Sequence, residues 1–305
     1  MKALVTGGAG FIGSHIVDRL LADGHQAVVL DDFSTGHRSN LPEDESLQII
    51  EGDISDVDTV NSCMQGVDWV FHKAAVASVP KTVNDPLGSS KVNYQGTLIL
   101  LEAARINNVK RFVFASSAAL YGDEPTLPKV ETMCPMTLSP YAVDKLASEN
   151  ACGMYTKLYG LETVCLRYFN VFGPKQDPSS PYSGVISIFT DKLKKNEVPT
   201  IFGDGEQTRD FVFVSDVVEA NMKAIKAEHG VGEYYNIATG NKITLNDLLK
   251  NLSDIYNIEF NVDYGEVRKG DIKESYAVID KAVSKLKWSP SVDLDSGLKM
   301  LCDSL

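Results

Sequence analysis

The sequence predicts an α/β fold in which a doubly wound parallel sheet is joined to a smaller α/β lobe. Short runs of β-forming residues alternate with amphipathic stretches through the first half of the chain, a pattern typical of parallel strands connected by helices. After Gly173 proline and glycine become frequent and the elements shorten, which marks a second lobe. We therefore assign residues 1–173 to the sheet domain, to which later segments can return, and residues 174–305 mainly to the smaller lobe.

The expected strands are short and mostly apolar, and a helix at about residues 140–159 precedes the last of them. In the smaller lobe, Thr244 is expected to cap a helix that begins at Leu245, with Asp247 at its third position. The last helix is expected at residues 294–301. The six expected strands are residues 3–6, 27–30, 48–50, 69–71, 111–115 and 163–168.

Composition limits the classes of function. The chain has 29 basic and 41 acidic residues and a formal net charge of -12, which disfavours a nucleic-acid partner because such proteins present a basic face. Neither its five cysteines nor its five histidines show metal-ligand spacing, so we expect no metal site and no disulfide framework. With no evident signal peptide or membrane-spanning stretch, a cytoplasmic protein without a membrane partner is expected.

A glycine-rich turn follows the first expected strand and leads into an apolar-periodic helix. Gly7, Gly10 and Gly13 are spaced as GxxGxxG. Without Cβ atoms, backbone N–H groups can approach a pyrophosphate, and the start of the helix attracts its negative charge. A turn that is merely tight is the alternative, but the position between strand and helix favours a Rossmann-type dinucleotide site.

Two acidic residues at the end of the second expected strand indicate which dinucleotide is bound. Asp31 lies 18 residues after Gly13, where a carboxylate can accept hydrogen bonds from the adenosine ribose hydroxyls, and Asp32 follows it. A carboxylate repels a ribose 2′-phosphate, so we expect NAD rather than NADP. The alternative is a solvated turn, in which aspartate is common.

The strongest chemical signal is the YxxxK pair Tyr141 and Lys145, preceded by Ser117 at the end of the fifth expected strand. Residues four apart share one face of a helix. The ammonium and a bound nicotinamide ring both favour the phenolate, so we expect the pKa of Tyr141 to be lowered and Tyr141 to act as a base. Ser117 is expected to hold the reacting oxygen of the substrate. A surface helix pair is the alternative.

Taken together, these motifs resemble the extended short-chain dehydrogenases/reductases and, among them, the UDP-hexose 4-epimerases. Residues 114–122, 167–174 and 203–211 extend the resemblance across most of the chain. In that family, 4,6-dehydratases carry an Asp-Glu pair after the strand-end hydroxyl and decarboxylases carry a glutamate, whereas Ala118 and Ala119 stand here. The resemblance therefore implies C4 epimerisation through a transient 4-keto sugar, with NAD bound throughout.

The resemblance also implies which residues contact the two ligands, with packing or surface roles as the alternatives. Arg209 and Arg268 are the expected partners of the UDP phosphates, because guanidinium groups bind phosphate in bidentate fashion. The implied NAD contacts, besides the glycines and Asp31 and Asp32, are Phe11, Ile12, Asp53, Ile54, Ala74, Ala75, Asn93, Tyr141, Lys145 and Tyr168. The implied substrate contacts are Ser78, Ser117, Tyr141, Asn170, Val185, Thr200, Phe202, Arg209, Arg268, Asp271 and Ser275.

Substrate range and assembly are also implied by the resemblance. In these epimerases a tyrosine at the position of Ser275 crowds the sugar 2-substituent, so the serine favours turnover of UDP-N-acetylglucosamine and UDP-N-acetylgalactosamine as well as UDP-glucose and UDP-galactose. Residues 86–107 and 140–159 resemble helices that pair in a homodimer. The alternatives are a UDP-uronate 4-epimerase, another nucleotide-sugar oxidoreductase, or a non-catalytic NAD-sensing protein, which need not retain Ser117, Tyr141 and Lys145.

Overall fold

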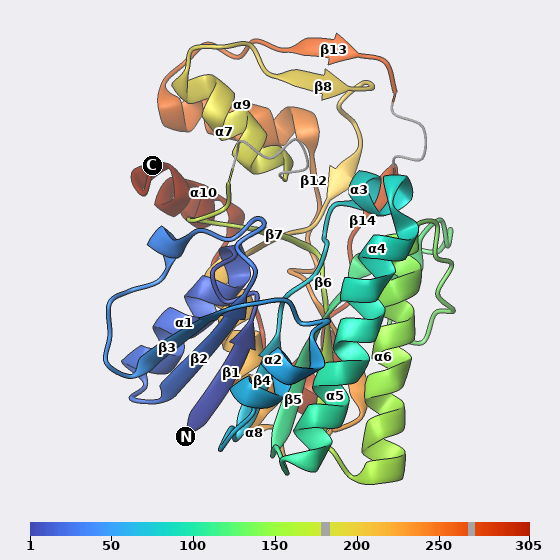
Figure 1. Cartoon of the computed structure of the whole chain (residues 1–305). Coiled ribbons are helices and arrows are strands. Elements are labelled where there is room, and N and C mark those ends of the chain that lie inside the picture. The colour runs from blue at the N-terminus through green and yellow to red at the C-terminus, as the bar shows by residue number, and fades with distance from the viewer. Residues whose placement is uncertain (178–183, 268–271) are drawn as a thin grey trace.

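The computed structural model describes residues 1–177, 184–267 and 272–305, and a seven-stranded sheet forms its centre (Figure 1). All the pairings between its strands are parallel, and their order is β11-β6-β5-β4-β1-β2-β3. The strands are β1 (Lys2–Thr6), β2 (Gln26–Asp31), β3 (Leu47–Glu51), β4 (Trp69–His72), β5 (Arg111–Ser117), β6 (Thr163–Tyr168) and β11 (Glu233–Ile237).

The six strands expected from the sequence are confirmed, each within two residues at either end. The seventh, β11, comes after the change of texture at Gly173 and pairs with β6, with Tyr235 opposite Leu166. The chain thus returns to the sheet through the helix α8 (Val214–Lys226) and β11. The doubly wound, Rossmann-type class is as expected. The boundary between sheet domain and smaller lobe at residue 173 stays a prediction.

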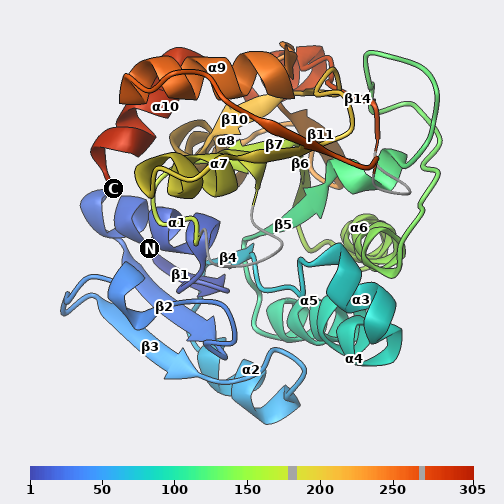
Figure 2. The same cartoon turned by 90° about the horizontal axis from the view of Figure 1, so that it is seen from above.

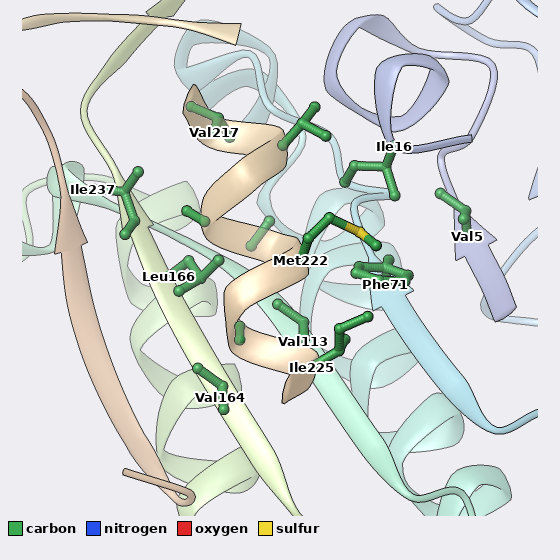
Figure 3. Close-up of a cluster of buried hydrophobic side chains, with 14 of the residues drawn as sticks. Val5, Ile16, Phe71, Val113, Val164, Leu166, Val217, Met222, Ile225 and Ile237 are labelled. Carbon is green, nitrogen blue, oxygen red and sulfur yellow. The ribbon is translucent and has the colours of Figure 1, made fainter. Parts of the chain in front are cut away.

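Helices cover both faces of the sheet, which explains why most of its strands are mainly apolar. On one face lie α1 (Phe11–Ala22) and α8. Figure 3 shows Met222 of α8 close to Phe71 of β4 in the buried cluster on this face. The opposite face is covered by α2 (Val57–Cys63), α5 (Thr97–Ile106) and α6 (Pro140–Tyr159).

The boundaries of α6 match the expected helix, and local signals fix both of its ends. The Ser139 hydroxyl accepts a hydrogen bond from the Ala142 N–H, and Pro140 takes the first helical position, where its missing N–H costs nothing. Gly160 ends the helix with φ 73°, a left-handed conformation that favours glycine. Tyr141 therefore lies in the first turn of a firmly bounded helix.

The segment before α5 contains three short helices rather than one long one. They are α3 (Val79–Asn84), α4 (Pro86–Ser90) and the π-helical turn η2 (Lys91–Gly96), which continues directly into α5. Pro86 follows the Asp85 cap and starts α4. Figures 1 and 2 both show α3, α4, α5 and α6 grouped on one side of the sheet, and α6 contacts each of the others.

The smaller lobe lies above the edge at which the sheet strands end (Figure 1). As expected, Thr244 caps the helix that starts at Leu245: its hydroxyl accepts from the Asp247 N–H at 3.0 Å. The two-stranded pair of β7 (Asn170–Phe172) and β10 (Phe211–Phe213) joins the lobe to the sheet. The other elements are α7 (Val185–Lys194), β8 (Thr200–Phe202), β9 (Thr208–Arg209), β12 (Ile243–Thr244), α9 (Leu245–Tyr256), β13 (Asp263–Gly265), β14 (Glu274–Ser275) and α10 (Leu294–Asp303).

Two buried carboxylates hold the lobe to the sheet domain. Asp210 accepts hydrogen bonds from the Thr239 hydroxyl and N–H and from the Gly240 N–H, just after β11. Asp216 of α8 accepts from Ser291 and Val292 ahead of α10. Within the described ranges, no helix combines the length and the apolar character needed to cross a lipid bilayer.

Candidate active site

The glycine-rich turn brings three backbone segments into van der Waals contact. Gly7 has φ 66°, and its N–H donates to the Leu30 carbonyl at 2.9 Å. A Cβ atom on Gly13 would lie 2.1 Å from the Gly7 carbonyl oxygen, and one on Gly7 would lie 2.6 Å from the Ala74 nitrogen. Side chains at Gly7 and Gly13 are thus excluded by backbone, so the turn can form only with glycine at these positions.

The start of α1 is available to a ligand. In the part of the chain that the structure describes, no side chain caps the helix at Gly10. The first-turn N–H groups and the helix dipole therefore face the crevice between β1 and β4, where the strand order reverses. Phe11 packs against the core of the smaller lobe, while Ile12 packs against the sheet core. Ala74 and Ala75 follow β4, and the Ala74 backbone borders the same turn.

Asp31 is buried beside the turn and helps to shape it. One carboxylate oxygen accepts from the Ala9 N–H at 2.9 Å and the other from the Phe33 N–H at 2.9 Å. Burial raises the pKa of Asp31, and the two N–H bonds partly oppose that shift. Each oxygen keeps acceptor capacity for a ribose hydroxyl. Asp32 is exposed and accepts from Ser34.

Of the remaining predicted cofactor residues, Asp53 and Ile54 follow β3, whereas Asn93 lies in η2. Asp53 follows β3 and accepts from the Ser55 N–H at 2.8 Å, and Ile54 is buried against Gly96. The Asn93 side chain is engaged within the protein: its amide accepts from the Val76 N–H at 2.8 Å and donates to the Val76 carbonyl. Asn93 therefore shapes the loop after β4, whatever else it contacts.

Tyr168 takes part in a buried polar cluster that the sequence did not predict. The Lys73 ammonium donates to the Tyr168 hydroxyl at 3.0 Å, and the Asn221 amide of α8 donates to the same oxygen at 2.8 Å. Burial, followed by repulsion from Lys145, holds the pKa of Lys73 well below its usual range. The cluster places a second lysine near the predicted catalytic one.

The structure brings Ser117, Tyr141 and Lys145 together. Ser117 ends β5, where its hydroxyl accepts from the Ala119 N–H at 3.1 Å and shares a hydrogen bond with the Tyr141 phenol. The Lys145 ammonium donates to the Ala115 carbonyl at 2.7 Å and lies 5.8 Å from the centroid of the Tyr141 ring. A phenol, a hydroxyl and a buried ammonium thus meet at the end of one strand.

The expectation that Lys145 lowers the pKa of Tyr141 is wrong, whereas the lowering expected from a nicotinamide ring stays a prediction. Burial raises the pKa of the phenol, and the hydrogen bond with Ser117 opposes that shift. Lys145 is not among the groups that shift the pKa of Tyr141. Burial lowers the pKa of Lys145 to about 8, so this ammonium still carries most of its charge at neutral pH.

The predicted substrate residues lie mainly on the small strands of the smaller lobe. Arg209 of β9 pairs directly with Ser275 of β14, so these two side chains belong to adjacent strands. The Asn170 amide donates to the Asp210 carbonyl at 3.0 Å, and Ser78 caps α3 by accepting from the Lys81 N–H. Val185 begins α7, and Thr200 and Phe202 form the two ends of β8. Arg268 and Asp271 lie outside the described residues.

The chain is similar to known proteins that bind NAD. The model of the NAD dependent epimerase/dehydratase family matches residues 3–238 of the chain. A UDP-glucose 4-epimerase of Mycolicibacterium smegmatis is 39% identical over 303 residues, which make up 98% of this chain and 96% of the relative. The chain belongs to the NAD-dependent epimerase/dehydratase family.

Two solved structures share the whole architecture of this epimerase/dehydratase. A UDP-glucose 4-epimerase of Thermotoga maritima, crystallised with UDP-glucose, is 40% identical, with a TM-score of 0.95. The match covers 100% of this chain and 98% of the relative. A UDP-N-acetylglucosamine 4-epimerase of Methanobrevibacter ruminantium, in complex with UDP-N-acetylmuramic acid, is 39% identical, with a TM-score of 0.95. The match covers 99% of this chain and 97% of the relative.

The first turn and its surroundings fit the dinucleotide of this family. The backbone contacts that exclude Cβ atoms at Gly7 and Gly13, the uncapped start of α1 and the buried carboxylate of Asp31 lie at one strand edge. A pyrophosphate needs the first two features and a ribose diol needs the third. The expectation of NAD as cofactor agrees with the family.

Glu149 is a residue of this site that the sequence analysis missed, although its spacing from Lys145 gave a signal. Glu149 is four residues beyond Lys145, which is itself four beyond Tyr141, so the three share one face of α6. The structure pairs Glu149 with Arg167 of β6. Lys73 carried no comparable signal, because a single lysine after a strand is most often a surface residue.

The glycine contacts generate a first prediction. A Gly13→Ala substitution forces the new Cβ atom against the Gly7 carbonyl, so we expect loss of bound NAD and a lower melting temperature. The matched control is Gly153→Ala in α6, where the Cβ would lie 3.6 Å from the Gly232 carbonyl, an ordinary contact. Cofactor content per purified chain and thermal melting are the measurements. Full NAD content in Gly13→Ala would contradict the assignment of the turn.

Proposed function

We propose that the chain is an NAD-dependent UDP-hexose 4-epimerase that interconverts UDP-glucose and UDP-galactose and also accepts their N-acetylated counterparts. The observation that carries the proposal is the meeting of Ser117, Tyr141 and Lys145 at the end of β5, next to a turn that fits a dinucleotide. Membership of the epimerase/dehydratase family and relatives of both substrate classes support it.

Tyr141 and Ser117 move and hold the proton in this reaction. The Tyr141 phenolate removes the proton from the C4 hydroxyl of the sugar, and Ser117 holds the same oxygen through its hydroxyl. Bound NAD supplies the hydride acceptor and donor at C4, and its positively charged ring favours the phenolate. Return of the proton from Tyr141 to the keto oxygen completes the inversion after the sugar has turned over, without net oxidation.

Residues next to Ser117 disfavour the other reactions of the family. Elimination of water from the sugar needs a second acid and base beside the reacting carbon. Ala118 and Ala119 occupy the two positions after Ser117 and carry no ionisable group. Oxidation and reduction at one carbon needs only the proton relay of Tyr141 and Ser117, so epimerisation is the reaction for which this site is equipped.

Conversion without added reductant is the direct test. Purified protein with UDP-glucose is expected to form UDP-galactose, and Tyr141→Phe is expected to lower kcat by about 10²–10⁴-fold because the proton acceptor is lost. Product chromatography and retained NAD content in the variant are the measurements. If UDP-glucose, UDP-N-acetylglucosamine and UDP-glucuronic acid all remain unchanged, the proposal is wrong, and conversion of the uronate alone would favour a UDP-uronate 4-epimerase.

Ser275 is proposed to leave room for the sugar 2-substituent. It lies on β14 opposite Arg209, the predicted phosphate partner on β9. A Ser275→Tyr substitution fills that space, so we expect turnover of UDP-N-acetylglucosamine to fall about 10- to 100-fold with little change for UDP-glucose. Ser284→Tyr makes the same change at an exposed residue of another segment and is the matched control. Equal losses for both sugars would contradict the assignment.

We also propose that the chain forms a homodimer through α4 and α6. Leu87 of α4 is 85% exposed, and α6 presents a stripe of exposed apolar side chains at Val143, Met154 and Leu158. These positions on α6 recur at helical spacing, and an apolar surface of this kind marks an interface between proteins.

A charge in this stripe is expected to dissociate the dimer. Leu158→Asp places a carboxylate in the proposed apolar interface, where it has to be desolvated. Val57→Asp on α2, also at an exposed apolar residue, is the control. Sedimentation analysis is expected to give dimers for the wild type and for Val57→Asp and monomers for Leu158→Asp. A monomeric wild type would overturn the proposal.

A further inference from the structure

A buried ion pair joins α6 to β6 directly behind the proposed catalytic residues. Glu149 is 4% exposed and Arg167 1%. The Arg167 guanidinium donates to both carboxylate oxygens of Glu149, at 2.6 and 3.0 Å. The contact is bidentate, so it fixes direction as well as distance.

The pair acts on the same helix face that carries the proposed catalytic residues. Tyr141, Lys145 and Glu149 follow one another at intervals of four residues along α6. A rotation of the helix that displaced Tyr141 would also break the fork between Glu149 and Arg167. The ion pair therefore resists rotation of α6 about its own axis.

The two charged residues also hold the chain on either side of Ser117. Ser116 donates its hydroxyl proton to Glu149 at 2.7 Å. Arg167 donates to the Tyr121 hydroxyl at 3.0 Å, at the end of the short turn that follows Ser117. Ser117 thus lies between two residues that are fixed by one ion pair.

The same network continues to the smaller lobe. The Tyr121 hydroxyl donates to the Asn236 amide oxygen at 2.7 Å, and the Asn236 amide donates to the Lys129 carbonyl at 3.3 Å. The Lys129 N–H in turn donates to the Tyr276 carbonyl at 2.9 Å, one residue after Ser275. Hydrogen bonds therefore connect Ser116 and Tyr121, on either side of Ser117, to the strand proposed to border the sugar.

Stability alone does not account for such a pair. Replacing a buried ion pair by apolar residues of similar volume is often neutral or stabilising, because desolvation offsets the attraction. The pair between Arg111, at the start of β5, and Glu162, just before β6, lies at the opposite end of β6, and there the carboxylate side chain is 51% exposed. Of these two pairs, only the one beside the site is fully buried.

We propose that Glu149 and Arg167 are positioning residues that hold Tyr141, Ser117 and the Ser275 strand in mutual register for proton transfer to and from the sugar. The proposal rests on the proposed epimerase function and deepens it. Neither residue takes part in the chemistry, and both act through the residues that do.

The test removes both charges together, so that no buried charge is left unpaired. In Glu149→Leu combined with Arg167→Met, we expect a melting temperature close to that of the wild type. We expect kcat for UDP-glucose to fall about tenfold to hundredfold, with KM and bound NAD unchanged, because small displacements of reacting groups have effects of this size. A folded double variant with kcat within about twofold of the wild type would overturn the proposal.

The control removes the partly exposed pair at the other end of the strands. Arg111→Met combined with Glu162→Gln is expected to lower the melting temperature and to leave kcat unchanged at a temperature where the protein is folded. Equal loss of kcat in both double variants would also overturn the proposal, because it would show a general response to loosening of β5 and β6.

Two further measurements keep the result decisive. Tyr121→Phe removes only the hydroxyl between Arg167 and Asn236, and it takes the place of the double variant if the double variant does not fold. A lower kcat at constant KM is expected for Tyr121→Phe, and an unchanged kcat would contradict the proposal. A crystal structure of either variant needs no substrate. Displacement of Tyr141 relative to Ser117 is expected, and unchanged positions would contradict the inference even if UDP-glucose is not the substrate.

Discussion

The position of α6 against the ends of β5 and β6 is the constraint on which the site depends. The helix carries Tyr141 and Lys145, whereas Ser117 belongs to β5, so no local interaction can bring the three together. Capping by Ser139 fixes where the helix starts, and the Lys145 bond to the Ala115 carbonyl fixes its distance from β5. Proton transfer requires placement within a fraction of an ångström, and a well-bounded helix on a rigid parallel sheet supplies it.

Much of the fold could be predicted because its signals are local. The six expected strands are short, mostly apolar runs, and α6 has a serine cap, a proline at its first position and a glycine at its end. The strand β11 could not be found in this way. Its residues Glu233 to Ile237 mix polar and aromatic side chains between glycines, and only pairing with β6 makes them a sheet strand. That pairing is decided by the tertiary fold.

In the site, too, the features with local signals were predictable and those set by the tertiary fold were not. The GxxGxxG turn and the YxxxK pair were predictable because the chemistry requires those residue types at those spacings, and the structure places both at one sheet edge. The direction of the Tyr141 pKa shift was not predictable, because it depends on how far the tertiary fold buries the phenol. The engagement of Asn93 with Val76 likewise follows from a loop conformation that no local pattern specifies.

Local cations in an acidic protein show how the site can hold anionic ligands. The chain carries a net charge of -12, yet Lys73 and Lys145 both lie at the carboxyl edge of the sheet with lowered pKa values. Burial lowers the pKa of both, and repulsion from Lys145 lowers that of Lys73 further. Burying two cations there lowers the stability of the fold relative to an apolar core. This loss of stability becomes smaller when negative charge approaches the two ammonium groups. The phenolate form of Tyr141 and the phosphates of a dinucleotide both bring such negative charge, so the two lysines favour both.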